Sequence, residues 1–200
     1  MTQTLLCLGD SYTIGELVPL HDSFPYQTIQ LLRKAGLHFH APEIIAKTGW
    51  TTFELAEHLI HTQLEKQYDF VTLLIGVNNQ YRGLSIDDFK NDFDFLLKKA
   101  VHLSGENPER IIVLSIPDWG VTPFAVSNNQ QQIASEIDAY NQICEAAAKK
   151  QHCHFINITS SQREDGNKAE FLASDKLHPS GKEYAKWAEQ VSTIIKDQLK

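Results

Sequence analysis

Short apolar segments along the chain are separated by longer segments in which apolar residues recur every three or four positions. Predominantly apolar runs occupy residues 5–8, 69–76 and 110–116, and shorter strand-like segments occupy 39–46 and 154–158. Apolar runs that end at turn residues are typical of strands buried in a parallel sheet. The pattern therefore predicts five strands, the second and fifth of which are short.

The intervening segments predict five helices. Ser23-Phe24-Pro25 places a proline in a first helical turn, and Gly36 is a plausible cap at the end of that helix. Thr51 to Glu54 matches a capping box, and Ser85 begins the third helix. Two further helices carry apolar stripes over 133–147 and 184–195, the last beginning near Pro179. Strands alternating with helices indicate an α/β fold, a three-layer α/β/α sandwich with a five-stranded parallel sheet.

Composition narrows the class of protein. The 200 residues are 42% hydrophobic, which suits one domain spanning 1–200. A formal net charge of −7 argues against nucleic acid as a partner, because phosphates require a basic face. Cys7, Cys144 and Cys153 are odd in number, and their expected role is that of small core residues.

The sequence as given shows no leader and no apolar run long enough to span a bilayer. A cytoplasmic location without stable membrane insertion is therefore expected, provided that no leader has been removed. The sequence does not indicate an oligomeric state.

Residues able to carry chemistry follow the predicted strands. Ser11 follows the first strand, Gly49 the second and Asn78 the third, and Asp175 and His178 lie between the last strand and the last helix. Because parallel strands present their carboxyl ends at one edge of a sheet, these residues can converge there. They predict a site built from distant parts of the chain.

These residue types match the requirements of a serine nucleophile. Asp175 precedes His178 by three residues, so its carboxylate can accept the Nδ1 proton and leave Nε2 free to take the proton of Ser11. The backbone N–H groups of Ser11 and Gly49 and the amide of Asn78 can form an oxyanion hole, each donor contributing about 3 kcal/mol. Asp10 is expected to bond loop backbone rather than act as a general acid.

Gly9-Asp10-Ser11, Gly49, Asn78 and Asp175-Lys176-Leu177-His178 together resemble the SGNH hydrolases, also called the GDSL esterase/lipase superfamily. The resemblance implies a flavodoxin-like sandwich and hydrolysis of an ester, sometimes a thioester, through an acyl-enzyme with no metal and no cofactor. One position departs from the family pattern. The third block usually reads Gly-x-Asn-Asp, and here Asn79 replaces the acid.

Other residues in the same loops suggest a substrate pocket. Trp50, Tyr81 and Trp119 can line an acyl or sugar pocket or pack within their loops, and Asn79 can alter the shape of the pocket. Three histidine pairs, His38/His40, His58/His61 and His152/His154, have spacings that could suit zinc. None has a third ligand with convincing spacing, so surface histidines are the preferred interpretation.

Alternatives to the esterase remain at this stage. A flavodoxin-like module could hold a phosphate or nucleotide in the loop Asp10–Thr13, although that interpretation leaves Asp175 and His178 without a role. A transacylase would use the same acyl-enzyme with an alcohol as acceptor. The ester itself is undetermined among acetylated sugars, lysophospholipids, short-chain esters and thioesters, with a small intracellular ester modestly favoured.

Overall fold

A computed structural model describes residues 2–200 and confirms the predicted sheet. Its strands are β1 (Leu5–Gly9), β2 (Glu43–Ala46), β3 (Phe70–Leu74), β4 (Ile111–Leu114) and β5 (His154–Ile156). All four pairings are parallel and the strand order is β2-β1-β3-β4-β5. This is the flavodoxin-like order, in which the carboxyl ends of β1 and β3 adjoin the switch point where ligands bind.

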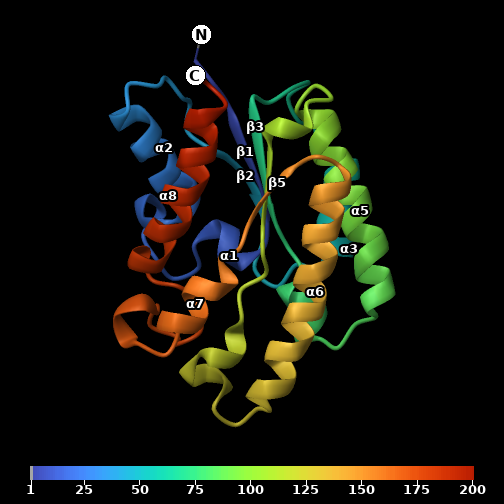
Figure 1. The fold of residues 1–200 in the computed structure, drawn as a ribbon, viewed down its shortest axis with the longest axis vertical. Coiled ribbons are helices and arrows are strands. Elements are labelled where there is room, and N and C mark those ends of the chain that lie inside the picture. The colour runs from blue at the N-terminus through green and yellow to red at the C-terminus, as the bar shows by residue number, and fades with distance from the viewer. Residues whose placement is uncertain (1) are drawn as a thin grey trace.

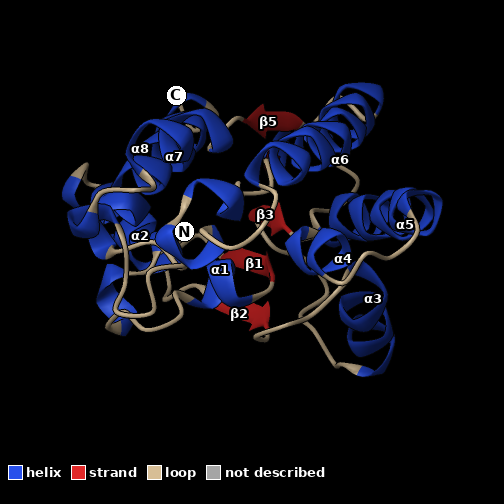
Figure 2. Cartoon of the chain, turned by 90° about the horizontal axis from the view of Figure 1, so that it is seen from below, coloured by secondary structure: helices blue, strands red, loops and turns tan. Residues whose placement is uncertain are grey.

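Helices cover both faces of the sheet (Figure 1). α2 (Phe24–Lys34) and α8 (Gly181–Asp197) lie on one face, and α3 (Thr52–His61), α5 (Ile86–Leu103) and α6 (Gln130–Lys150) lie on the other. Three shorter helices, α1 (Ser11–Ile14), α4 (Val77–Tyr81) and α7 (Thr159–Asp165), follow the carboxyl ends of β1, β3 and β5. Figure 2 views the molecule from the edge at which α1 and α4 lie.

Several helix boundaries follow the predicted local chemistry. The Thr51 side chain accepts the N–H of Glu54, whose carboxylate accepts the N–H of Thr51, so the capping box is complete. Ser85 accepts the N–H of Asp88 at the start of α5. Gly36 adopts φ +86°, the left-handed conformation expected just after the end of α2.

Two expected segments differ from the structure. The second strand begins at Glu43 rather than Phe39, because Pro42 has no N–H for a ladder and Phe39 forms only an isolated bridge with Gln3. The polar stretch 77–80, which lies outside the five predicted helices, belongs to the helix α4. Its polar sequence carries no apolar periodicity that would have indicated a helix.

The core consists of the central strands and the helix faces against them. Every residue of β1, β3 and β4 is buried. Trp187 of α8 is fully buried and packs against Tyr12, Phe24 and Tyr184, so it joins α1, α2 and α8. Cys7 and Cys144 are core residues, as expected, whereas Cys153 is half-buried.

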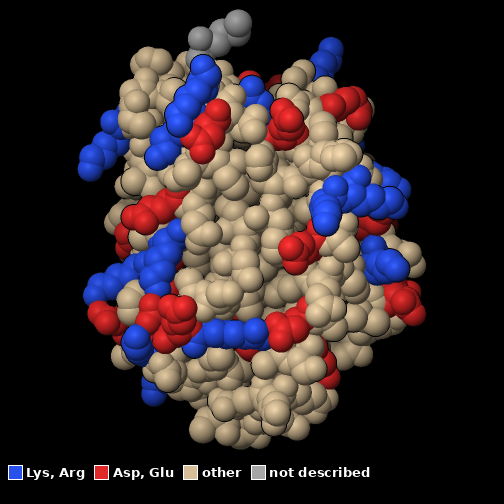
Figure 3. All heavy atoms as spheres, in the orientation of Figure 1, with Lys and Arg blue, Asp and Glu red and all other residues tan. Residues whose placement is uncertain are grey.

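Charged side chains of both signs are interspersed on the face shown in Figure 3, and the lower tip of that face shows none. Residues 119–135 contain no Lys, Arg, Asp or Glu. Among the helices of residues 2–200, none combines the length and the apolar character that crossing a membrane requires.

Candidate active site

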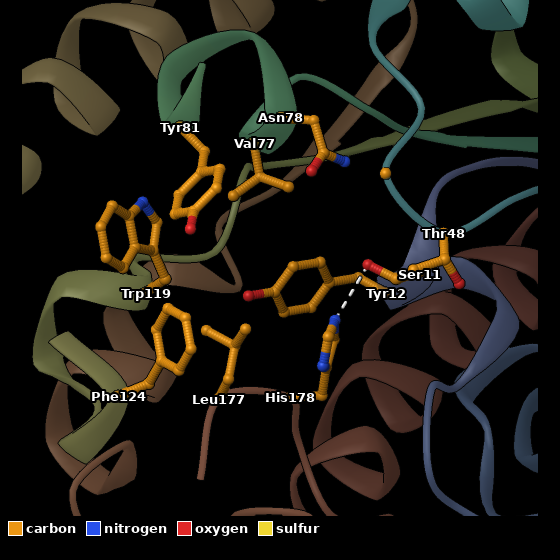
Figure 4. A pocket seen from close by; sticks show the side chains of 11 residues that line it. Ser11, Tyr12, Thr48, Val77, Asn78, Tyr81, Trp119, Phe124, Leu177 and His178 are labelled. Atoms are coloured by element: carbon orange, nitrogen blue, oxygen red, sulfur yellow. Dashed lines mark hydrogen bonds between the residues drawn. The ribbon is translucent and has the colours of Figure 1, made fainter. Parts of the chain in front are cut away.

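The turn between β1 and α1 places Ser11 at the carboxyl edge of the sheet. A Cβ on Gly9 would lie 2.4 Å from the carbonyl oxygen of Leu74 and closer still to Thr13, so only glycine fits where the strand ends. Asp10 caps α1 by accepting the N–H of Tyr12 at 3.0 Å. Ser11 is thereby the first residue of α1, with its hydroxyl pointing toward His178 (Figure 4).

Ser11, His178 and Asp175 form a continuous chain of hydrogen bonds. The Oγ of Ser11 lies 2.9 Å from Nε2 of His178, and Nδ1 of His178 lies 2.6 Å from Oδ2 of Asp175. Ser11 and His178 are 4% and 8% exposed, so water is largely excluded from the first of these bonds. The structure thus joins residues that are 167 positions apart in the sequence.

The carboxylate of Asp175 also organises the loop that carries it. Its Oδ1 accepts the backbone N–H groups of Leu177 and His178, each at 3.0 Å. Partial burial favours the neutral acid, but the bonds from the His178 ring and from these two N–H groups outweigh it and hold the pKa of Asp175 below its usual value. Asp175 is therefore ionised at neutral pH and fixes a proton on Nδ1.

Ser11, Gly49 and Asn78 line one cavity and carry N–H groups that can donate into it. Within residues 2–200, the backbone N–H groups of Ser11 and Gly49 have no hydrogen-bond partner. Gly49 has φ +84°, a conformation that favours glycine. The Nδ2 of Asn78 donates one hydrogen to the carbonyl of Trp50 at 2.9 Å, which leaves its second hydrogen free.

A cavity of about 210 Å³ adjoins these groups. Figure 4 shows Asn78 and Ser11 on one side of it, with Tyr81, Trp119 and Phe124 opposite. The rings of Tyr81 and Phe124 pack edge-on against Trp119, with centroids 5.2 Å and 6.2 Å away. None of the side chains that line it is that of Asp, Glu, Lys or Arg: they belong to Ser11, Tyr12, Thr48, Val77, Asn78, Tyr81, Trp119, Phe124, Leu177 and His178.

Two of the four residues expected in the pocket do not line this cavity. Trp50 packs instead on His58, with ring centroids 4.7 Å apart. Asn79 is buried and binds Thr52, accepting its N–H at 3.0 Å and donating to its Oγ1 at 2.8 Å. One step along α4 turns a side chain by about 100°, so Asn79 points away from the cavity that Asn78 lines.

Sequence reasoning missed five residues that line the cavity. Four of them directly adjoin a motif residue, so proximity to the motif residues was the available signal; they are Tyr12, Thr48, Val77 and Leu177. Phe124 adjoins no motif residue. Phe124 comes from a turn after β4, where no motif marks its direction.

Asp10 is 1% exposed, and burial raises the pKa of its carboxyl to about 7 although the N–H of Tyr12 opposes the shift. Its contacts are with backbone, as predicted, and not with the cavity. Across residues 2–200, no three His, Cys, Asp or Glu side chains are grouped so that they could hold a metal ion.

Comparison with known proteins identifies the family. The GDSL-like Lipase/Acylhydrolase family matches residues 7–186, so the chain belongs to that family, and the resemblance inferred from the motifs is confirmed. The protein is accordingly an ester hydrolase. No curated protein matches the sequence.

Solved structures share the fold at low sequence identity. TesA is 17% identical with a TM-score of 0.76, and the match covers 98% of this chain and 99% of TesA. The lipase/acylhydrolase from Enterococcus faecalis is 18% identical with a TM-score of 0.77, covering 98% and 97%. Axe2, an acetylxylan esterase from Geobacillus stearothermophilus, is 18% identical with a TM-score of 0.75, covering 96% and 94%.

Proposed function

We propose that the protein hydrolyses small carboxylic esters through an acyl-enzyme formed on Ser11. The supporting observation is the chain of hydrogen bonds from Ser11 through His178 to Asp175, at 2.9 Å and 2.6 Å. A serine hydroxyl is a weak nucleophile without an adjacent base, and an imidazole fixed by a carboxylate supplies that base.

In the proposed reaction, the Ser11 oxygen attacks the acyl carbon while Nε2 of His178 takes its proton. The negative charge that develops on the carbonyl oxygen is held by the N–H groups of Ser11 and Gly49 and by Nδ2 of Asn78. His178 then returns the proton to the departing alcohol. Water, deprotonated by His178, attacks the acyl-enzyme, and the acid leaves as Ser11 regains its proton.

The cavity favours an uncharged acyl group of limited size. Its volume is about 210 Å³, below the range of about 300–1,000 Å³ typical of pockets for drug-sized ligands. Aromatic and aliphatic side chains form the wall opposite the nucleophile. Among residues 2–200, Asp175 is the only ionised side chain within hydrogen-bonding distance of His178. We therefore infer that short acyl esters are better substrates than long-chain ones. Because Axe2 is an acetylxylan esterase, acetylated sugars belong in the substrate panel.

The test combines a substitution with covalent labelling. We expect Ser11→Ala to lower kcat for p-nitrophenyl acetate by several orders of magnitude, and a fluorophosphonate to add its mass to the peptide that contains Ser11. Ser160→Ala, at an exposed serine of α7, is the matched control and should retain the parent kcat. Unchanged turnover in Ser11→Ala would refute the proposal.

Product analysis defines the acceptor. With glycerol present, a hydrolase releases mainly the free acid, whereas transfer of the acyl group to glycerol would identify a transacylase with the same intermediate. A series of p-nitrophenyl esters of increasing chain length tests the size limit, and a kcat/KM that rises steadily with chain length would contradict it.

A further inference from the structure

Arg82 connects two elements that carry the oxyanion donors of the proposed function. It follows α4 and lies four residues beyond Asn78. Its Nη2 donates to the carbonyl oxygen of Gly49 at 2.5 Å. One guanidinium thus joins the end of the helix that carries one donor to the residue that carries another.

The peptide around Gly49 needs an external support. A glycine at φ +84° is free to adopt many other conformations, and its N–H has no partner within the described chain. The nearest atom to a Cβ built on Gly49 is Nη2 of Arg82, at 3.6 Å, so the guanidinium covers the side of the residue that lacks a side chain. Arg82 is therefore placed to select one orientation of this loop.

A second contact fixes the guanidinium itself. Nη1 of Arg82 lies 3.4 Å from both carboxylate oxygens of Glu54. Glu54 is the acidic residue of the capping box at the start of α3. The Glu54 and Arg82 side chains are 39% and 42% exposed, and exposed ion pairs contribute only about 0–1 kcal/mol to stability. Removing Arg82 should therefore disturb the geometry of the loop far more than the stability of the fold.

We propose that Arg82 is a positioning residue of the oxyanion hole. By holding the Gly49 carbonyl it orients the preceding N–H toward the developing oxyanion, and it touches neither the substrate nor Ser11. This inference rests on the proposed function. It adds a residue outside the GDSL and Asp-x-x-His motifs to the machinery of the site.

The test uses Arg82→Ala and Arg82→Lys with p-nitrophenyl acetate. Removing one oxyanion donor costs about 10²- to 10³-fold in rate, and a donor that is misplaced rather than removed should cost less, about 10- to 100-fold in kcat. We expect KM to stay within twofold and the affinity for a boronic acid, which mimics the tetrahedral intermediate, to fall in parallel with kcat. Arg82→Lys, which can still donate to the carbonyl, should retain more activity than Arg82→Ala.

Chemical rescue separates positioning from a merely structural role. Added guanidinium ion should restore part of the kcat of Arg82→Ala. The matched control is Arg33→Ala, which removes an arginine that also donates to a backbone carbonyl, that of Phe39, at 3.1 Å and 2.8 Å but at the opposite edge of the sheet. Arg33→Ala should keep the parent kcat and show no response to guanidinium.

The outcomes distinguish this inference from the proposed function. A kcat of Arg82→Ala within twofold of the parent, a loss confined to KM, or a kcat loss that guanidinium leaves unchanged overturns the positioning role. If any of these occurs while Ser11→Ala is inactive, the esterase mechanism stands without Arg82. Retained activity in Ser11→Ala overturns both.

Discussion

Asp175 acts on His178 through two oxygens with different partners. Oδ1 accepts two backbone N–H groups of the tail loop, and Oδ2 accepts the imidazole Nδ1–H. A carboxylate can accept at both oxygens, whereas an amide accepts at one and donates at the other. The loop geometry and the proton position on His178 are therefore separable by a single substitution.

We expect Asp175→Asn to keep the fold and lose activity. The amide oxygen can still accept the backbone N–H groups, but its NH₂ faces Nδ1 and favours the tautomer with the proton on Nε2, which cannot accept the proton of Ser11. A loss in kcat of about 10⁴-fold is expected for the wrong tautomer. Asp197→Asn, which removes a surface carboxylate paired with Lys200, is the control. Activity in Asp175→Asn within tenfold of the parent would contradict the tautomer role.

Asp10 makes stability depend on pH. Burial raises the pKa of its carboxyl to about 7 in the folded protein, above the ordinary value of 3.8. Between these two values the folded state binds more protons than the unfolded state, so the free energy of unfolding falls as pH rises and levels off above about pH 7.

Asp10→Asn should remove this dependence, because the amide oxygen can still accept the N–H of Tyr12. We expect the free energy of unfolding of the variant, relative to that of the parent, to be larger at about pH 8 than at about pH 5. The increase should be on the order of 1 kcal/mol for each unit by which folding raises the pKa of Asp10. Urea unfolding of both proteins at the two pH values measures the gain. An identical difference at both would show that Asp10 does not titrate in this range.

At the scale of elements, α4 organises the site although its sequence did not predict a helix. Within α4, Asn78 donates to the Trp50 carbonyl and Asn79 binds Thr52. Arg82, directly after α4, donates to the Gly49 carbonyl. The five long helices were predictable because each has an apolar stripe and most have a capping signal. α4 has neither, and tertiary hydrogen bonds to the loop 49–52 support its position.

Asn79, which stands where the family pattern has an acid, takes part in a short chain of hydrogen bonds with Thr52 and Asp92. The NH₂ of Asn79 donates to Oγ1 of Thr52, and that hydroxyl donates to Oδ2 of Asp92 on α5 at 3.1 Å. Burial raises the pKa of Asp92, with the nearby charge of Asp88 adding to the shift and the Thr52 hydroxyl opposing it. With an amide at position 79, the Thr52 hydroxyl has a single carboxylate, that of Asp92, to which it donates.

We expect Asn79→Asp to lower the free energy of unfolding by about 1–3 kcal/mol, because two carboxylates would compete for the single Thr52 proton. Asp92→Asn should recover most of that loss when combined with Asn79→Asp, and the coupling is measured by a double-mutant cycle in urea. Additive effects of the two substitutions would rule out the shared hydroxyl.

At the scale of the molecule, the convergence of Ser11, Asn78 and His178 was predictable and the lining of the cavity was not. Parallel strands present their carboxyl ends at one edge, so strand order and strand ends suffice to bring distant loops together. Whether Trp50 or Trp119 faces the cavity depends on backbone turns of a few residues within each loop. The periodicity of hydrophobic residues does not predict the direction of those turns.

Because the edge of the sheet rather than the order of the chain assembles the site, a circular permutant should remain active. Figure 1 marks N and C at the same end of the molecule, away from α1, and the test joins them with a flexible Gly/Ser linker. New ends between Lys66 and Gln67 fall in an exposed loop before β3, remote from Ser11. We expect this permutant to unfold cooperatively and to keep kcat for p-nitrophenyl acetate within about tenfold of the parent.

A second permutant opened between Lys47 and Thr48 cuts the loop that presents Gly49 and should fold yet lose about 10²-fold or more in kcat. Equal activity in the two permutants would show that the loop after β2 does not need continuous backbone to supply its N–H. Inactivity of the first, in a folded state, would show that chain order constrains the site beyond the geometry of the sheet.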